Sequence, residues 1–194
     1  METSLRLPDA YFERAYDGNP DPWDFEASPY ERRKAEVLLA SLPRERYLHA
    51  FEPGCSNGAL TARLATRANQ VLGMEVVPTV ADCARKRFSA DRTVRVQTGA
   101  IPEDWPSHAT FDLIVLSEVG YYLTRSGLDL AMRLVRESLS AGGDVVSVNY
   151  RGGTDSPLSG ADVDAAVRAL PSARCLVSHE EPGFLLTVVR YEPD

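Results

Sequence analysis

Apolar residues along the chain change their spacing several times, and these changes predict strands that alternate with helices. Five short apolar runs predict strands, at residues 47–51, 71–75, 94–98, 111–116 and 145–148. Between the last two runs, Leu128, Met132 and Val135 recur at helical spacing, and the glycines at 142 and 143 are expected to end that helix. The run 111–116 is apolar almost throughout, as in a strand buried on both faces. This alternation predicts an α/β domain with a mostly parallel sheet.

Two helices are predicted before the first strand. Residues 8–16 have a short helical pattern, which the prolines at 20 and 22 interrupt. Ser28 can cap a second helix, with Glu31 placed for a capping box and Pro43 ending the helix. One face of that helix is formed by Tyr30, Lys34, Leu38 and Leu42. Residues 1–45 are therefore expected to be a helical cap on a single domain that comprises residues 1–194.

After the fifth strand the pattern predicts a helix at 161–170 and then an antiparallel hairpin. Its strands are residues 174–178 and 184–191, joined by the turn Glu180-Glu181-Pro182-Gly183.

The segment from Glu52 to Gly58 is a sharp corner between the first strand and a helical pattern at Leu60, Leu64 and Ala68. Gly54 and Gly58 lack a Cβ, so a ligand can approach the backbone closely there. A dinucleotide site has the pattern G-x-G-x-x-G, whereas this corner reads E-x-G-x-S-x-G, with Ser56 in it. The carboxylate of Glu52 would repel a pyrophosphate and favours a cationic ligand.

Glu75 ends the second predicted strand, where an acid in a βαβ unit usually holds the two hydroxyls of a ribose. A ligand that combines a ribose with positive charge satisfies both this acid and Glu52. S-adenosylmethionine is such a ligand, with S-adenosylhomocysteine as its product. Arg33 could clamp the carboxylate of its methionine arm, although a solvated surface role for Arg33, or the same role for Arg32, is an alternative.

With these motifs the chain resembles the class I S-adenosylmethionine-dependent methyltransferases, and within them the nodulation protein S group. The resemblance is carried by the E-x-G-x-S-x-G corner, by Glu75, and by the segments 96–100, 111–118, 21–23, 28–31, 117–123 and 157–160. It implies a Rossmann-like, doubly wound sheet of seven strands with a C-terminal antiparallel hairpin. It also implies N-methylation of an amino sugar or another small amine-bearing metabolite.

The resemblance implies further cofactor contacts. Tyr16 and Trp23 would lie over the cofactor, although the alternative that the tryptophan caps the core is equally open. The adenine would lie at the segment Gly99, Ala100 and Ile101, near Val76. Many relatives carry an aspartate in place of Ala100, so backbone groups or a neighbour such as Glu103 would have to accept from the adenine.

The methyl acceptor is expected at the carboxyl end of the fourth strand, where ligands bind in open α/β sheets. Ser117 is placed with the cofactor, and Glu118 is the candidate for a base or an acid that orients an amine. Tyr121 and Tyr122 would be walls or hydroxyl partners, unless they only pack against the next helix. Asn149, at the end of the fifth strand, would face the acceptor.

Composition narrows the partners. A net charge of −7 disfavours a nucleic-acid partner, and three cysteines without metal-like spacing suggest neither a disulfide framework nor a metal site. No apolar run reaches membrane-spanning length, so a cytoplasmic protein is expected. The sequence leaves open whether it is a monomer or a homodimer. Two alternative functions also remain: O-methylation of a small metabolite, against which the lack of a histidine near the fourth strand counts, and a non-catalytic cofactor-binding partner subunit.

Overall fold

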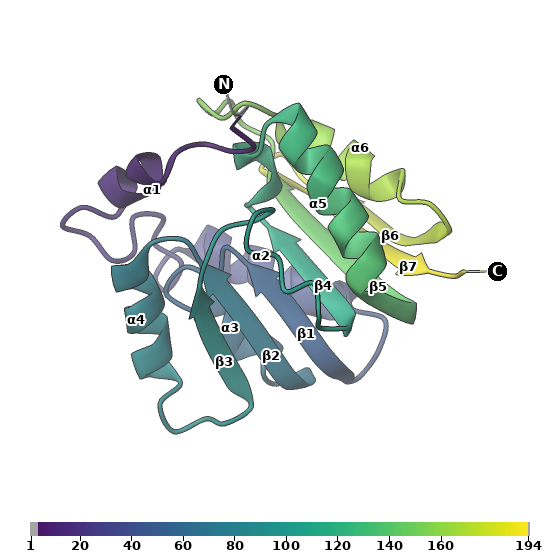
Figure 1. Ribbon diagram of the computed structural model, residues 1–194, viewed down its shortest axis with the longest axis horizontal. Coiled ribbons are helices and arrows are strands. Elements are labelled where there is room, and N and C mark those ends of the chain that lie inside the picture. Colours follow the sequence, from purple (N-terminus) through teal and green to yellow (C-terminus); the bar gives the residue numbers. More distant parts are fainter. Residues whose placement is uncertain (1–3, 194) are drawn as a thin grey trace.

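A computed structural model describes residues 4–193 and has a seven-stranded sheet at its centre (Figure 1). The strands, with their order across the sheet β3-β2-β1-β4-β5-β7-β6, are β1 (Tyr47–Pro53), β2 (Ala68–Glu75), β3 (Val94–Thr98), β4 (Phe111–Ser117), β5 (Leu139–Tyr150), β6 (Ala173–Glu180) and β7 (Phe184–Tyr191). The first five strands pair in parallel, and β7 pairs antiparallel with both β5 and β6. The predicted fold class and C-terminal hairpin are confirmed.

The strand order reverses between β1 and β4. From β1 the chain proceeds outward through β2 and β3, and then returns to place β4 on the other side of β1. A crevice forms at the carboxyl ends of the strands on either side of such a reversal. The glycine corner after β1 and the Ser117-Glu118 segment after β4 therefore meet at one place.

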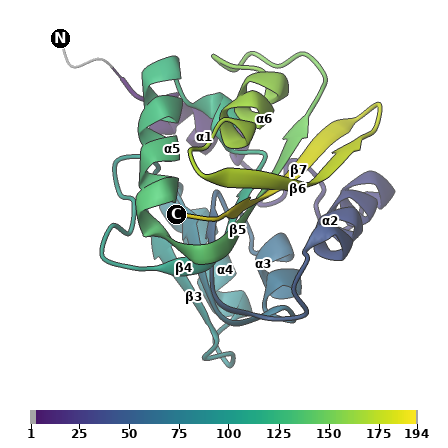
Figure 2. The same cartoon turned by 90° about the vertical axis from the view of Figure 1, so that its right-hand side faces the viewer.

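Helices cover both faces of the sheet (Figures 1 and 2). On one face lie α2 (Pro29–Ser41), α3 (Ala59–Leu64) and α4 (Pro78–Arg87), and on the other lie α5 (Arg125–Ser138) and α6 (Gly160–Arg168). β4 contributes Leu113 and Val115 to the first core and Ile114 and Leu116 to the second. This alternation explains why the sequence of β4 is apolar almost throughout.

Two predicted boundaries are wrong. The helix after the glycine corner ends at Leu64, and Ala68 is the first residue of β2, where it pairs with Tyr47. The helix before β5 ends at Ser138 instead of at the glycines, because Leu139 already pairs with Phe111 of β4. In both places an apolar residue that continues a helical pattern is buried as part of a strand.

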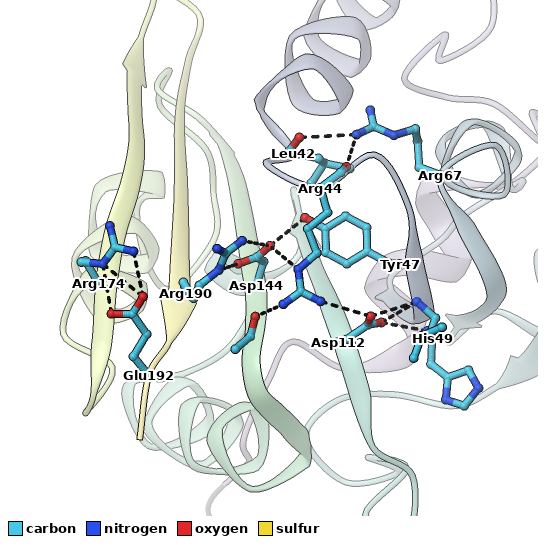
Figure 3. A network of polar contacts seen from close by, with 12 residues as sticks. Leu42, Arg44, Tyr47, His49, Arg67, Asp112, Asp144, Arg174, Arg190 and Glu192 are labelled. Atoms are coloured by element: carbon cyan, nitrogen blue, oxygen red, sulfur yellow. Dashed lines mark hydrogen bonds and ion pairs between the residues drawn. The ribbon is translucent and has the colours of Figure 1, made fainter. Parts of the chain in front are cut away.

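The amino-terminal end of the sheet is closed by a polar network (Figure 3). Asp144 is fully buried and accepts two hydrogen bonds from the guanidinium of Arg190, at 2.8 and 3.0 Å, and one from the hydroxyl of Tyr47. Asp112 accepts from the backbone N–H groups of Leu48 and His49. Arg44 lies within 3.5 Å of Asp112 and within 3.7 Å of Asp144 and links the two carboxylates. Each buried acid at this end thus has cationic partners.

The N-terminal segment lies at the opposite, carboxyl-terminal end of the sheet (Figure 1). Its helix α1 (Asp9–Ala15) has no buried residue. Just before α1, the N–H of Leu7 donates to the carbonyl of Tyr122, and Arg6 pairs with Leu123 in an isolated β-bridge. Tyr122 belongs to η1 (Gly120–Tyr122), a 3-10 turn that follows β4. Within residues 4–193 no helix has the length and hydropathy to cross a membrane.

Candidate active site

A cavity of about 370 Å³ opens at the carboxyl ends of β1, β2 and β4. That volume suits a ligand of nucleoside size. The predicted site residues that line it are Tyr16, Trp23, Glu52, Gly54, Ser56, Glu75, Val76, Gly99, Ala100, Ile101, Ser117, Glu118, Tyr121 and Tyr122. Three predicted site residues, Arg33, Gly58 and Asn149, are not among the lining residues.

The glycine corner brings backbone to the cavity wall. Gly54 has φ +71°, and a Cβ at this position would lie 3.0 Å from the Cγ2 of Val119. A larger residue here would be strained by the left-handed conformation and would press on the side chain of Val119. Ser56 also has a positive φ, of 49°, and its N–H donates to Glu75. The backbone of this corner is therefore positioned by Glu75, the same carboxylate that is predicted to bind a ribose.

Glu75 lies at the tip of β2 and is 4% exposed. Its Oε2 accepts from the N–H of Ser56 at 3.1 Å and its Oε1 accepts from the N–H of Val77 at 2.9 Å. Burial raises the pKa of this carboxyl, and the two backbone donors partly oppose that rise. No cation pairs with Glu75 among the described residues, so lone pairs remain for donors that enter the cavity.

Glu52 is even more isolated, at the end of β1. It is 2% exposed, and its one hydrogen-bond partner in the described chain is the hydroxyl of Thr61, at 2.5 Å. Burial raises the pKa of Glu52 to about 8. A buried carboxylate with a single neutral donor is costly unless a cation approaches it. Together, Glu52 and Glu75 give the cavity a preference for positive charge.

Glu118, predicted to be a base or an acid that orients an amine, has both carboxylate oxygens bound by the protein. Its Oε1 accepts from the ammonium of Lys34 at 2.7 Å, and its Oε2 accepts from the hydroxyl of Tyr121 at 2.8 Å and the N–H of Tyr150 at 2.9 Å. Its backbone has φ +56°, which is uncommon for a residue with a side chain. These contacts join the ends of β4 and β5 to α2, so Glu118 is first of all a structural junction.

Aromatic side chains from the N-terminal segment cover the cavity. Tyr16 donates its hydroxyl to the Oγ of Ser56 at 2.7 Å, and the ring of Trp23 lies edge-on to Tyr16 with centroids 5.1 Å apart. Phe12 packs edge-on against Tyr122, with centroids 5.1 Å apart. Trp23 is 37% exposed, so it is part of the cavity wall and does not cap the core. Burial raises the pKa of Tyr16, which keeps its hydroxyl protonated.

The structure corrects the prediction for Arg33. Its guanidinium is exposed and pairs with Glu181 of the β6–β7 turn at 2.7 Å. The next residue, Lys34, points into the cavity instead and is 6% exposed. The reason is helical geometry, because Lys34 lies on the same buried face of α2 as Leu38. The sequence does contain a sign of this arrangement, because Lys34 interrupts an otherwise apolar face of the predicted helix; the predicted site did not include it.

Asn149 and Gly58 are also placed away from the cavity. Asn149 is completely buried on the α6 side of β5, where its Nδ2 donates to the Oγ of Ser147. Its neighbour Val148 belongs to the core on the opposite face, and successive strand residues point to opposite faces. Gly58 caps α3 with φ +81°, and a Cβ there would meet the ring of Phe88 at 2.7 Å. Its role is therefore close packing behind the corner.

Neither of the acids that follow Ala100, Glu103 and Asp104, is among the lining residues of the cavity. Glu103 pairs with Arg6 at 3.3 Å and does not line the cavity. Asp104 lies against this segment, and its Oδ2 accepts from the N–H of Ala100 at 2.9 Å. The residues of the lining that sequence reasoning missed include Glu31, Lys34 and Tyr150.

Comparisons with known sequences agree with this geometry. A family model described as Nodulation protein S (NodS) matches residues 10–150. Nodulation protein S of Rhizobium tropici is 33% identical over 128 residues, which cover 65% of this chain and 53% of that protein. The protein of the same description from Sinorhizobium fredii is 32% identical over 104 residues, which cover 53% of this chain and 48% of that protein. The chain spans about half the length of the curated relatives that it matches.

Solved structures extend the likeness to almost the whole chain. A Pseudomonas syringae protein described as a candidate methyltransferase is 37% identical, with a TM-score of 0.74, over 83% of this chain and 98% of that one. The N-methyltransferase NodS of Bradyrhizobium japonicum, solved with S-adenosylhomocysteine, has a TM-score of 0.83 at 24% identity, over 94% of this chain and 98% of that one. At that identity the second likeness establishes the fold alone, which is the Rossmann-like methyltransferase fold.

Proposed function

This chain belongs to the nodulation protein S family, and from that premise we propose that it transfers a methyl group from S-adenosylmethionine to a nitrogen of a small amine. The observation that carries the proposal is the pair of buried carboxylates, Glu52 and Glu75, that face one cavity without a cationic partner in the described chain. A sulfonium and an ammonium on a ribose-bearing ligand would supply the missing charge and donors.

In the proposed complex Glu75 accepts from the ribose hydroxyls, and Glu52 lies next to the positive end of the methionine arm. The adenine lies against the part of the cavity wall that Val76 and residues 99–101 form. Lys34, rather than Arg33, is the cation available to the methionine carboxylate, since Lys34 has three N–H donors and two carboxylates already hold it in the cavity. Residues 1–45 act as the cap on a single domain.

The reaction requires positioning more than chemical assistance from the protein. When bound, S-adenosylmethionine supplies a methyl group that is already activated on a sulfonium. The chain has to align a nitrogen lone pair with that methyl group and exclude water. The aromatic residues Phe12, Tyr16 and Trp23 would exclude water on one side, and Tyr121 and Tyr122 would form the wall on the other.

Two observations favour a nitrogen acceptor over a hydroxyl. The lining includes four acids, Glu31, Glu52, Glu75 and Glu118, against two cations, Arg6 and Lys34, and this excess of acids favours an ammonium. No histidine is among the lining residues, although O-methylation commonly uses one as a strong base. The description of the Bradyrhizobium japonicum relative as an N-methyltransferase points in the same direction. An amino sugar is the acceptor that we propose first.

Calorimetry with S-adenosylhomocysteine and a methyl-transfer assay test this proposal together. The assay measures S-adenosylhomocysteine production from S-adenosylmethionine with glucosamine, a panel of other primary amines, and matched alcohols such as glucose. We expect micromolar binding and turnover with amines only. Turnover with alcohols would indicate O-methylation, and binding without any turnover would indicate a partner subunit. Absence of binding would refute the cofactor assignment.

A further inference from the structure

Glu31 and Glu118 flank the ammonium of Lys34 inside the cavity. The Nζ of Lys34 lies 2.9 Å from Glu31 and 2.7 Å from Glu118. The three side chains are 13%, 8% and 14% exposed for Glu31, Lys34 and Glu118 respectively. Two acids and one base leave this buried cluster with one negative charge in excess.

The two carboxylates differ in the donors around them. Glu118 receives three hydrogen bonds, from Lys34, Tyr121 and the N–H of Tyr150. The carboxylate of Glu31 has Lys34 as its one recorded partner in the described chain. Only half of the predicted capping box forms, since the N–H of Glu31 donates to Ser28 while its carboxylate turns toward the cavity. Three of the lone pairs of Glu118 are thus occupied, whereas Glu31 keeps more of its lone pairs available to a donor in the cavity.

The surroundings of Glu31 also favour proton uptake. Burial raises its pKa, and Lys34 lowers it by a smaller amount. Burial by itself would lower the pKa of Lys34, but the two carboxylates together raise it, so the lysine stays charged. Glu31 is therefore nearer than an ordinary glutamate to the range in which a carboxylate can act as a base near neutral pH.

Resting on the proposed function, we propose that Glu31 is the base that takes a proton from the ammonium of the acceptor. The proton moves from the R–NH₃⁺ group to the carboxylate of Glu31, which leaves R–NH₂ with a free lone pair. The nitrogen then forms a bond to the methyl carbon while the carbon–sulfur bond breaks and its electron pair goes to sulfur. The products are R–NH₂CH₃⁺ and neutral S-adenosylhomocysteine, and Glu31 returns its proton to solvent.

Other ionisable groups in the lining are less suited to this step. Burial raises the pKa of Tyr16, Tyr121 and Tyr122, so each remains a hydroxyl donor. Glu75 is held by two backbone N–H groups at the cofactor corner. Glu52 is 2% exposed at the base of the same corner, where it faces the donor. Glu31 comes instead from α2, on the cap side of the cavity.

The test uses Glu31→Gln, which keeps the size and polarity of the side chain, and Glu31→Ala. The control is Glu36→Gln on the same helix, where the side chain is 63% exposed and does not line the cavity. Turnover is measured from pH 5 to pH 9 with glucosamine, or with the amine from the panel that the unaltered protein methylates best. Calorimetry with S-adenosylhomocysteine monitors the cofactor site of each variant.

For Glu31→Gln we expect kcat to fall about 100-fold, in the range typical of a lost general base. Cofactor affinity should stay within twofold of the unaltered protein, because the amide oxygen of the glutamine can still accept from Lys34. The decline of kcat toward acidic pH should disappear, and added formate should restore part of the activity of Glu31→Ala. Glu36→Gln should match the unaltered protein. A purely structural role for Glu31 would not produce formate rescue or the altered pH profile.

Three results would overturn the inference. A kcat of Glu31→Gln within threefold of the unaltered protein, or no rescue of Glu31→Ala by formate, would remove Glu31 from the reaction. Loss of S-adenosylhomocysteine binding in Glu31→Gln would make it a cofactor residue. If the unaltered protein methylates no amine, the proposed function fails first and this inference fails with it; a fully active Glu31→Gln refutes the inference alone.

Discussion

The two ends of the sheet treat buried carboxylates in opposite ways. At the amino-terminal end, Asp144 is surrounded by Arg190, Arg44 and Tyr47 (Figure 3). At the carboxyl-terminal end, Glu52 has one hydroxyl and Glu75 has two backbone N–H groups. Equally buried acids are therefore neutralised by the chain at one end and left without a cation at the other.

This difference separates a structural role from a binding role. A buried acid that is paired within the protein helps to fix one conformation and has little left to offer a ligand. A buried acid without a cation is unfavourable in the free protein, and a cationic ligand removes that cost on binding. The contrast predicts that mutations at the first end lower stability at every pH, whereas mutations at the second change ligand affinity and the pH dependence of stability.

The largest effect is expected from Arg190→Leu. This variant removes the bidentate partner of Asp144 and leaves a completely buried carboxylate short of a cation. We expect the free energy of unfolding to fall by about 3–5 kcal/mol in urea titrations.

Arg174→Leu is the matched control for that experiment. Arg174 makes an equally short, bidentate pair with Glu192, the residue after β7, but its side chain is 59% exposed (Figure 3). Its loss should change the free energy of unfolding by less than about 1 kcal/mol. Equal effects of the two variants would show that burial does not distinguish these arginine pairs.

An intermediate effect is expected from Glu52→Gln, and it depends on pH. The pKa of Glu52 is about 8 in the folded protein and about 4.3 in an unfolded chain. Because the folded value is the higher one, the stability from this group is complete below about pH 4 and is lost as the pH rises through 8. Removing the carboxyl should therefore make unfolding less pH-dependent, by about 3 kcal/mol between pH 5 and pH 8.

Urea titrations of the ligand-free protein at several pH values measure this slope. Glu137→Gln provides the control, because Glu137 is exposed on α5. An unchanged slope in Glu52→Gln would mean that Glu52 is already ionised in the free protein. In that case burial would not hold Glu52 in its protonated form, and the free cavity would already contain its negative charge.

The smallest of the three effects is expected from Glu75→Ala. Loss of the ribose acceptor should weaken S-adenosylhomocysteine binding by about 1–3 kcal/mol, measured by calorimetry at pH 7. Asp82→Ala, on the exposed side of α4, should leave the affinity unchanged. Undiminished affinity in a folded Glu75→Ala protein would refute the ribose assignment.

The fold could be predicted because its determinants are local. Apolar runs and helical spacing located the five parallel strands, and the turn at 180–183 located the hairpin. The errors at Ala68 and Leu139 arose where the pattern continues across a boundary. Those boundaries are set by strand partners that are distant in sequence, Tyr47 and Phe111, and no local rule identifies them.

The site was predictable to the extent that it depends on backbone position. The residues at strand ends, such as Glu52 and Glu75, line the cavity because the topology places them there. Side-chain direction was the part that failed. Arg33 and Lys34 differ by about 100° around α2, so the choice between them depends on which face of the helix is buried. The prediction for Asn149 failed because its side chain points to the α6 side of β5 and is buried there, away from the cavity.

The hydrogen bond from Leu7 to the carbonyl of Tyr122 joins the cover of the cavity to the wall beside the acceptor. α1 itself has no buried residue, and the segment is held to the cavity by this bond, by the β-bridge at Arg6 and by the contact of Phe12 with Tyr122. Displacing the segment therefore pulls on Tyr122. On the function proposed above, release of S-adenosylhomocysteine from beneath this segment would therefore be linked to release of the methylated product beside Tyr122.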